Sequence, residues 1–335
     1  TDFTFTRLLV ARYSIGMKIT LHSATMRTRT PNVQRKNVKR VTPGTDMTYR
    51  CAFLSMDDLA GYVCDDPLAV AAIEAAGWSV DTLSWRAAGV DWRRYEAVVI
   101  RSTWDYQDHP DAFLAALKAI DTSGTRLLNP LATVQWNLTK RYLAELESRG
   151  IPIVPSAWGD HLDAGTLDAY FDAFDTRQIV VKPVVSANAK DTFRLDRGNE
   201  PALASAAARF SSEAYVAQPF IPAIVDEGEY SLFYFDGVYS HAILKTPAPA
   251  DFRVQEEHGG RIVPINPEPL FVRRAQDVLD AAGERLLYAR IDLVRTSKND
   301  AALMELELIE PSLYFRMDAE SPQRFARAFL RILRE

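Results

Sequence analysis

Hydrophobic and polar positions between residues 49 and 128 alternate between strand-like and helix-like spacing. Strand-like runs cover 49–55, 78–83, 97–100 and 126–128, and helical spacing covers 66–76 and 110–120. The run 97–100 is wholly apolar, which is typical of a parallel strand covered on both faces. We therefore predict an open α/β domain with a parallel sheet over residues 49–135.

The pattern changes after residue 135. Helical spacing appears at 139–149, 271–282 and 322–333, and strands are predicted at 178–183, 215–220, 229–235, 237–245, 261–263, 290–294 and 303–311. The pair Asp236-Gly237 between two of these strands favours an antiparallel hairpin. We divide this α+β part into two lobes, 136–222 and 223–335.

The last predicted strand carries acidic residues on one face. Glu305 and Glu307 are two apart and point the same way in a strand, whereas Leu306 and Leu308 point toward a core. Asp292 lies in the preceding apolar strand, and two neighbouring strands that aim acids at one spot suit a hard cation such as Mg²⁺. The alternative is a solvated edge strand. Glu310 follows closely, and a bulge before Pro311 would bring it into the same set.

Composition is that of a globular protein, with 47% hydrophobic and 25% charged residues in 335. No apolar run approaches the roughly 20 residues of a membrane helix, which predicts no membrane partner. Cys51 and Cys64 are too few for a disulfide framework. We interpret them as reduced thiols of a cytoplasmic protein.

The net charge of −5 is unevenly distributed. Residues 1–46 hold nine Lys and Arg against two Asp and no Glu, so the remainder is acidic. We interpret 1–48 as a disordered basic extension before a body that begins near Met47; a targeting peptide and a nucleic-acid-binding arm are the alternatives. The acidic body argues against nucleic acid as a partner.

Polar residues follow the apolar strand 97–100, where open sheets bind ligands. A cation, two hydroxyls and an acid gather there beside two aromatic residues, and this set suits a small zwitterionic substrate; the alternative is a capped turn around a packed Trp104. The predicted substrate residues are Arg101, Ser102, Thr103 and Asp105.

Lys182 ends another apolar strand and needs an anion, because a buried unpaired ammonium is costly. A nucleotide phosphate would serve, with Lys140 beside it. The segment 186–192, which begins at Ser186, is similar to a phosphate-covering loop but contains no glycine.

The proline-bounded segment 218–222 is rigid and extended, and can offer backbone groups to an adenine edge. Glu229 at the next strand start could take ribose hydroxyls. Lys245, Arg253 and Arg290 would neutralise phosphate charge in a transition state.

The order of these features resembles the ATP-grasp superfamily over residues 49–333. Ser102–Tyr106, Gln218–Phe220, Asp251–Gly260 and Glu305–Pro311 resemble the subgroup that contains the D-cycloserine cyclo-ligase. The resemblance implies a pre-ATP-grasp α/β domain followed by a two-lobed ATP-grasp fold.

The resemblance also implies roles for single positions. Lys140 and Lys182 would contact nucleotide phosphates, Arg290 would bind phosphate, and Glu229 would bind ribose. The adenine contacts would come from Gln218, Phe220 and Ile221, and the metal carboxylates would be Asp292 and Glu305. The chain departs from the family at Glu305-x-Glu307, where Glu-x-Asn is usual, so which two of Glu305, Glu307 and Glu310 bind metal stays open.

We predict an ATP-dependent carboxylate–amine ligase that uses ATP and Mg²⁺, with Mn²⁺ as a substitute. A small amino-acid-like carboxylate would become an acyl phosphate, and an amine of the same or a second molecule would attack it, with Arg253 stabilising the charge. A small-molecule kinase and a non-catalytic ATP sensor are the alternatives. The resemblance also allows a homodimer.

Overall fold

The structure is a computed structural model that describes residues 49–334, which belong to one compact unit. The predictions for residues 1–48 lie outside the described residues.

The first part is the parallel sheet that the sequence predicts. Its order is β2-β1-β3-β4, and each neighbouring pair is parallel. Helices α1 and α2 both have proline in the first turn, where its missing N–H costs nothing. The elements are β1 (Arg50–Ser55), α1 (Asp66–Glu74), β2 (Ser79–Ser84), β3 (Ala97–Ser102), α2 (Pro110–Thr122) and β4 (Arg126–Leu128).

Two short helices connect this sheet to the next. They are α3 (Leu131–Asn137) and α4 (Tyr142–Ser148). The sequence predicts one helix over 139–149 and misses α3. The chain is not helical at Lys140 because its N–H donates to the carbonyl of Val184, 2.8 Å away, in a different element.

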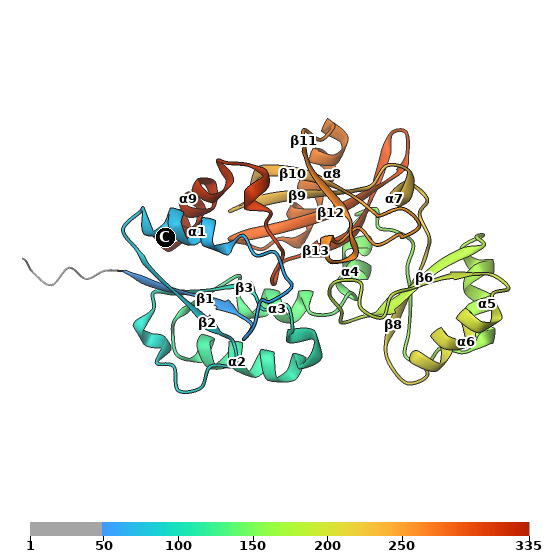
Figure 1. The fold of residues 1–335 in the computed structure, drawn as a ribbon, viewed down its shortest axis with the longest axis horizontal. Coiled ribbons are helices and arrows are strands. Elements are labelled where there is room, and N and C mark those ends of the chain that lie inside the picture. The colour runs from blue at the N-terminus through green and yellow to red at the C-terminus, as the bar shows by residue number, and fades with distance from the viewer. Residues whose placement is uncertain (1–48, 335) are drawn as a thin grey trace, which may run out of the picture. The chain divides into compact units, whose positions relative to one another are not determined.

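The second sheet is antiparallel, with the order β5-β8-β6-β7. Helices α5 and α6 lie beside it, at the right of the view in Figure 1. Leu167 and Phe171 of α5 and Leu203 of α6 join the core of this sheet. The elements are β5 (Ala157–Gly159), α5 (Ala164–Ala173), β6 (Gln178–Pro183), β7 (Phe193–Asp196), α6 (Glu200–Arg209) and β8 (Tyr215–Pro219).

The third sheet has five antiparallel strands in the order β11-β10-β9-β12-β13. The predicted turn between β9 and β10 is confirmed, since Asp236 and Gly237 both have positive φ (48° and 73°), as a tight hairpin of this kind requires. The elements are α7 (Ala223–Asp226), β9 (Glu229–Phe235), β10 (Val238–Thr246), β11 (Arg261–Ile265), α8 (Pro269–Ala282), β12 (Tyr288–Ser297), β13 (Asp300–Glu307) and α9 (Ser321–Arg334).

The last helix, α9, returns to the first sheet and lies beside α1 (Figure 1). Its Phe325 meets Phe53 of β1 edge-on at 6.4 Å between ring centres, and its Phe329 meets Trp78 at 5.0 Å. One hydrophobic core therefore contains residues of β1, β3, β9 and α9.

Both cysteines are free, as predicted; Cys51 is buried in β1 and Cys64 is half-buried. Among residues 49–334, no helix combines the length and the apolar content that a membrane crossing requires.

Candidate active site

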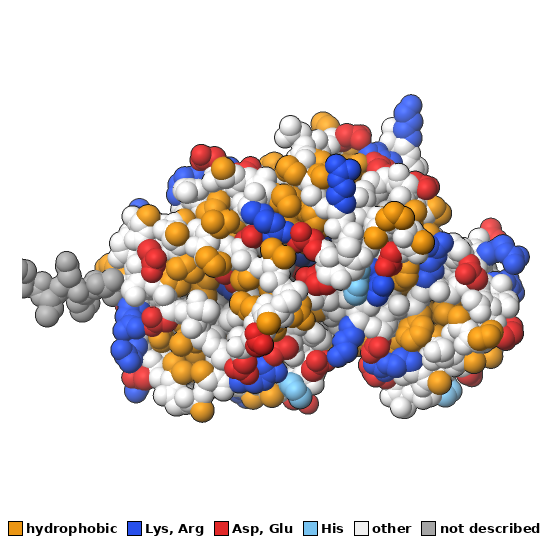
Figure 2. All heavy atoms as spheres, viewed as in Figure 1, with side chains coloured by type: hydrophobic (Ala, Val, Ile, Leu, Met, Phe, Trp, Pro, Cys, Tyr) orange, Lys and Arg blue, Asp and Glu red, His pale blue; other side chains and the backbone are white. Residues whose placement is uncertain are grey.

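A cavity between the second and third sheets brings most of the predicted site residues together. Figure 2 shows acidic and basic side chains side by side near the middle of the visible face. The predicted residues that line the cavity are Lys140, Lys182, Ser186, Gln218, Phe220, Ile221, Glu229, Lys245, Arg253, Arg290, Glu305 and Glu307.

The four predicted substrate residues do not line this cavity. Arg101 is buried, with its guanidinium 3.1 Å from Asp66 and donating to the carbonyl of Pro311 at 3.0 Å. The hydroxyl of Ser102 donates to Ser55, and Thr103 is fully buried. The carboxylate of Asp105 accepts from the Trp85 indole at 2.7 Å.

For Arg101 and Ser102 the reason is that β3 continues to Ser102, so their side chains enter the layers that cover the sheet. The aromatic neighbours Trp104 and Tyr106 line the cavity instead. They belong to the segment that the sequence predicts to bind substrate, although they are not among the four residues predicted to contact it. The signal that could have identified them is two aromatic side chains just beyond the carboxyl end of a parallel strand.

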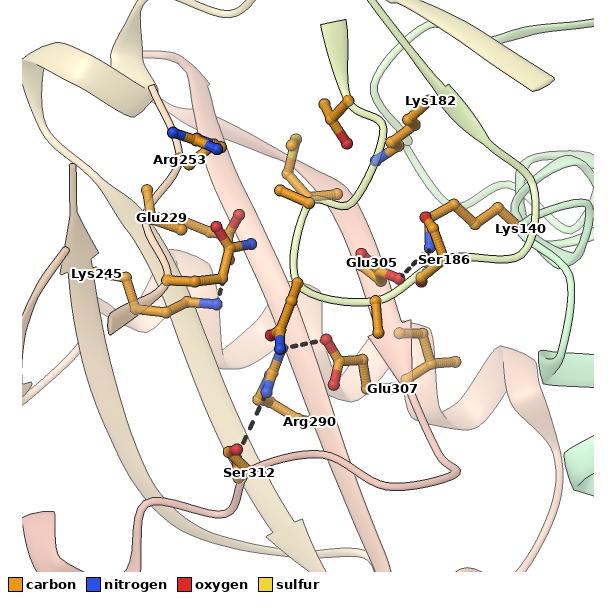
Figure 3. Close-up of a pocket in the computed structure, with 18 of the residues that line it drawn as sticks. Lys140, Lys182, Ser186, Glu229, Lys245, Arg253, Arg290, Glu305, Glu307 and Ser312 are labelled. Carbon is orange, nitrogen blue, oxygen red and sulfur yellow. Dashed lines mark hydrogen bonds and ion pairs between the residues drawn. The ribbon is translucent and has the colours of Figure 1, made fainter. Parts of the chain in front are cut away.

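The acidic positions of β12 and β13 lie side by side as predicted. Asp292 is directly opposite Glu305, and Arg290 is opposite Glu307. Basic side chains fill the space around these carboxylates (Figure 3). Lys140 donates to Glu305 at 2.7 Å, and Arg290 pairs with both Glu307 and Asp292.

The Lys245 ammonium pairs with Glu229 on the neighbouring strand (Figure 3) and lies 3.4 Å from Asp292. Asp292 also accepts from the hydroxyl of Ser231 at 2.5 Å and is only 2% exposed. It is therefore enclosed by groups of its own sheet, whereas Glu305 and Glu307 keep 29% and 27% of their side chains exposed.

The glutamates at this end of the cavity differ in their pKa. Burial would raise the pKa of Glu305, but Lys140 and Lys182 outweigh burial and lower it. Burial raises the pKa of Glu307 to about 7, and Asp292 and Glu305 add to this rise while Arg290 opposes it. Burial likewise raises the pKa of Glu310 well above its usual range, with Glu307 and Glu305 adding to it. A cation bound beside Glu307 and Glu310 would therefore stabilise their charged forms.

The donor chemistry fits a divalent cation at Glu305 and Glu307, which offer carboxylate oxygens from one face of β13. Within residues 49–334, no three Asp, Glu, His or Cys side chains already form a metal cage. The carboxylates of Glu305 and Glu307, which would bind the metal, are instead paired with Lys140 and Arg290. Asp292 could join the set only by exchanging its present partners.

The opposite wall of the cavity carries Lys182, whose pKa is lowered by burial. Among the described residues its ammonium has no ion pair within 4.0 Å. The loop 186–192 lies beside it, and Asn188, Ala189 and Asp191 adopt the positive φ values (52–53°) that glycine would favour. The loop therefore adopts a backbone conformation typical of glycine without containing one, and its contact with phosphate stays a prediction.

The predicted adenine segment forms a partly apolar wall. The guanidinium of Arg194 lies 3.8 Å from the centre of the Phe220 ring, and Phe252 meets that ring edge-on at 6.3 Å. Gln218 is buried, and its amide donates to Ser156 at 2.9 Å. A flat aromatic ligand would find a hydrophobic surface here.

Arg253 lies on the long connection between β10 and β11. Its guanidinium donates to Asp251 at 2.8 Å, and this hydrogen bonding holds the pKa of Asp251 well below its usual range. With 37% of its side chain exposed, Arg253 lines the cavity and keeps donor capacity toward it (Figure 3).

Known proteins resemble this arrangement. Residues 51–129 match the family model described as the N-terminal domain of D-cycloserine synthetase DcsG. The cycloserine biosynthesis protein DcsG of Streptomyces lavendulae is 33% identical over 279 residues, which cover 79% of this chain and 92% of that protein. The chain belongs to the DcsG family of ATP-grasp ligases.

Solved structures agree with this membership. The crystal structure of D-cycloserine synthetase DcsG matches with a TM-score of 0.76 and 30% identity, over 85% of this chain and 99% of that chain. The D-alanine–D-alanine ligase of Bacillus anthracis matches with a TM-score of 0.62 at 12% identity, over 86% and 99%, which shows a shared fold. This DcsG-family protein is an enzyme that forms C–N bonds with ATP.

Proposed function

We propose that this ligase activates a small amino-acid-like carboxylate as an acyl phosphate and then joins it to an amine. The observation that carries the proposal is that one cavity is lined by Lys182 and Lys140 and by Glu305 and Glu307, with Lys140 paired to Glu305. Phosphate-binding cations and metal-binding carboxylates are the two parts that phosphoryl transfer from ATP requires.

The nucleotide would lie along the wall formed by β6, β8 and the loop 186–192. Lys140, Lys182 and Ser186 would bind phosphates, the segment from Gln218 to Ile221 would contact adenine, and Glu229 would bind ribose. The support is that Lys182 has no described ion pair and that the apolar side chains of Phe220, Ile221 and Phe252 line the same cavity.

Glu305 and Glu307, with Asp292 behind them, would hold Mg²⁺. The ion would supply positive charge that neutralises the negative charge on the phosphate oxygens. Lys140 and Arg290 would then be released from these carboxylates and become free to bind phosphate oxygens. Arg253, Lys245 and Arg290 would stabilise the negative charge that develops on the acyl group.

The relative's name suggests an intramolecular reaction. D-cycloserine is a five-membered ring whose C–N bond joins a carboxyl carbon to an aminooxy nitrogen, so the open-chain acid is β-aminooxy-D-alanine. We propose an aminooxy or amino acid of this class as substrate. We also propose a cytoplasmic location, which the two free thiols support. A homodimer is part of the same proposal.

Incubation of the enzyme with ATP, Mg²⁺ and pools of amino and aminooxy acids, including β-aminooxy-D-alanine, tests the proposal. We expect ADP together with a product that is lighter than its substrates by one water, detected by mass spectrometry. A phosphorylated product that retains the phosphoryl group would favour the kinase alternative instead.

The metal assignment is tested with Glu305→Gln. The amide keeps the shape of the side chain but is a weaker metal ligand, so we expect about a 100-fold loss of Mg²⁺-dependent ADP formation while circular dichroism shows that the fold is retained. The matched control is Glu96→Gln, because Glu96 is exposed and does not line the cavity. Unchanged turnover would remove Glu305 from the site.

A further inference from the structure

Glu310 lines the cavity but has no role in the function proposed above. It follows β13, and its backbone carbonyl accepts from the indole of Trp104 at 2.9 Å. The next carbonyl, that of Pro311, accepts from Arg101 at 3.0 Å. Two hydrogen bonds from the first domain therefore hold the backbone at Glu310 and Pro311 in place.

Glu310 differs from the acids around it in having no basic partner. Glu305 pairs with Lys140, Glu307 pairs with Arg290, and Glu229 pairs with Lys245. Among residues 49–334, no nitrogen of Lys, Arg or His lies within 4.0 Å of the Glu310 carboxylate. Glu310 is half-buried, and a half-buried carboxylate with no cation nearby gains from binding a cationic ligand.

The side chains near Glu310 suit an organic cation. Trp104 and Tyr106 line the same cavity as Glu310, and the indole of Trp104 is held at the Glu310 backbone carbonyl. The Trp104 ring is held by Tyr62 at 5.4 Å between ring centres. An acid beside aromatic rings binds ammonium groups by an ion pair and by attraction to the ring faces.

We propose that Glu310, Trp104 and Tyr106 form a subsite for the α-ammonium group of the amino-acid substrate. The inference rests on the proposed function and deepens it, since it names the group that selects the substrate. The ammonium would be anchored at this subsite, while the carboxylate of the same molecule would reach the cations Arg253 and Arg290. Carboxylic acids without the amino group would leave Glu310 unpaired and would be rejected.

The subsite is tested by comparing β-aminooxy-D-alanine with 3-aminooxypropanoic acid, which lacks only the α-amino group. We expect the wild-type enzyme to prefer the first by about 10–100-fold in kcat/KM, as hydrogen bonding between charged groups implies. Glu310→Gln removes this preference, while the KM for ATP and the Mg²⁺ concentration for half-maximal rate stay unchanged. Glu310→Asp, which keeps the charge, retains part of the preference, and Glu96→Gln retains all of it.

Two results would overturn the inference. Equal losses with both substrates would mean that Glu310 does not read the ammonium, and a raised Mg²⁺ requirement would place Glu310 among the metal ligands instead. Wild-type turnover itself tests the proposed function, so the two failures are distinguishable.

Binding provides a test that needs no turnover. D-cycloserine carries the ammonium and isoxazolidin-3-one lacks it, and both can be titrated calorimetrically into the wild-type and Glu310→Gln proteins. We expect tighter binding of D-cycloserine to the wild type and no discrimination by the variant. Equal affinity of the wild-type protein for D-cycloserine and isoxazolidin-3-one would also overturn the inference.

Discussion

Lys182 is the clearest single residue by which to test the nucleotide wall. It ends β6, lines the cavity and has no ion pair among the described residues. Burial without a partner lowers the pKa of its ammonium, so a phosphate would restore the charge that burial opposes.

Lys182→Met keeps the length of the side chain and removes the charge. We expect the KM for ATP to rise about 10–100-fold, because a charged hydrogen bond to phosphate is lost in an enclosed site. The substrate carboxylate should retain its KM. Steady-state ADP release measures both, with Lys118→Met on the exposed face of α2 as control. If the KM for ATP does not change, Lys182 does not contact the nucleotide.

At the level of secondary structure, β13 is positioned by the helices that precede the second sheet. Asn137 at the end of α3 donates to the carbonyl of Leu306 at 2.8 Å and accepts from the N–H of Leu308 at 3.0 Å. The hydroxyl of Tyr142 in α4 accepts from the N–H of Leu306. These contacts cover the open edge of β13 and so fix the direction of Glu305 and Glu307.

Asn137→Ala tests this arrangement. The change leaves two backbone groups of β13 without partners, and we expect a loss of about 2–4 kcal/mol in the free energy of unfolding. Turnover should also fall, with a higher Mg²⁺ requirement, because the carboxylates lose their fixed direction. Urea unfolding and Mg²⁺ titration measure the two effects. Asn299→Ala, in the exposed turn before β13, should change neither; a similar effect there would refute the specific role of Asn137.

Most of the sheet strands could be predicted from the sequence, but several helices could not. Strand parity alone placed Glu305 and Glu307 on one face, and the register confirms Asp292 beside them. Helices α5 and α6 are rich in alanine and short polar residues, so their buried side has little contrast with the exposed side. Their burial comes from packing on a sheet that is assembled from distant segments.

The site shows the same division between local and long-range information. Lys182 and Glu305 follow from their own strands, because each is a charge in an apolar context. The burial of Arg101 depends on Asp66 and on the carbonyl of Pro311, which is 210 positions away along the chain. No local pattern contains such a contact, and so Arg101 was expected to bind substrate when it instead supports the segment that carries Glu310.

At the scale of the whole molecule, the first sheet depends on the C-terminal helix. Phe325 of α9 is fully buried and contacts Phe53, Phe235 and Phe315 through ring pairs at 5.3–6.4 Å. The core therefore joins the first domain to the last lobe, and the walls on both sides of Glu310 keep their relative position only while this core is intact.

Phe325→Ala should consequently destabilise both ends of the described chain together, by about 3–5 kcal/mol. The thiol of Cys51, buried in β1, reports on the first sheet: it should become reactive at the same lowered urea concentration at which circular dichroism changes. Phe210→Ala removes a fully buried ring from the separate core of the second sheet and should leave Cys51 protected to higher urea. The opposite result would be a Phe325→Ala protein in which circular dichroism changes at lower urea but Cys51 keeps its wild-type protection. The two ends would then unfold independently, and the first sheet would not depend on α9.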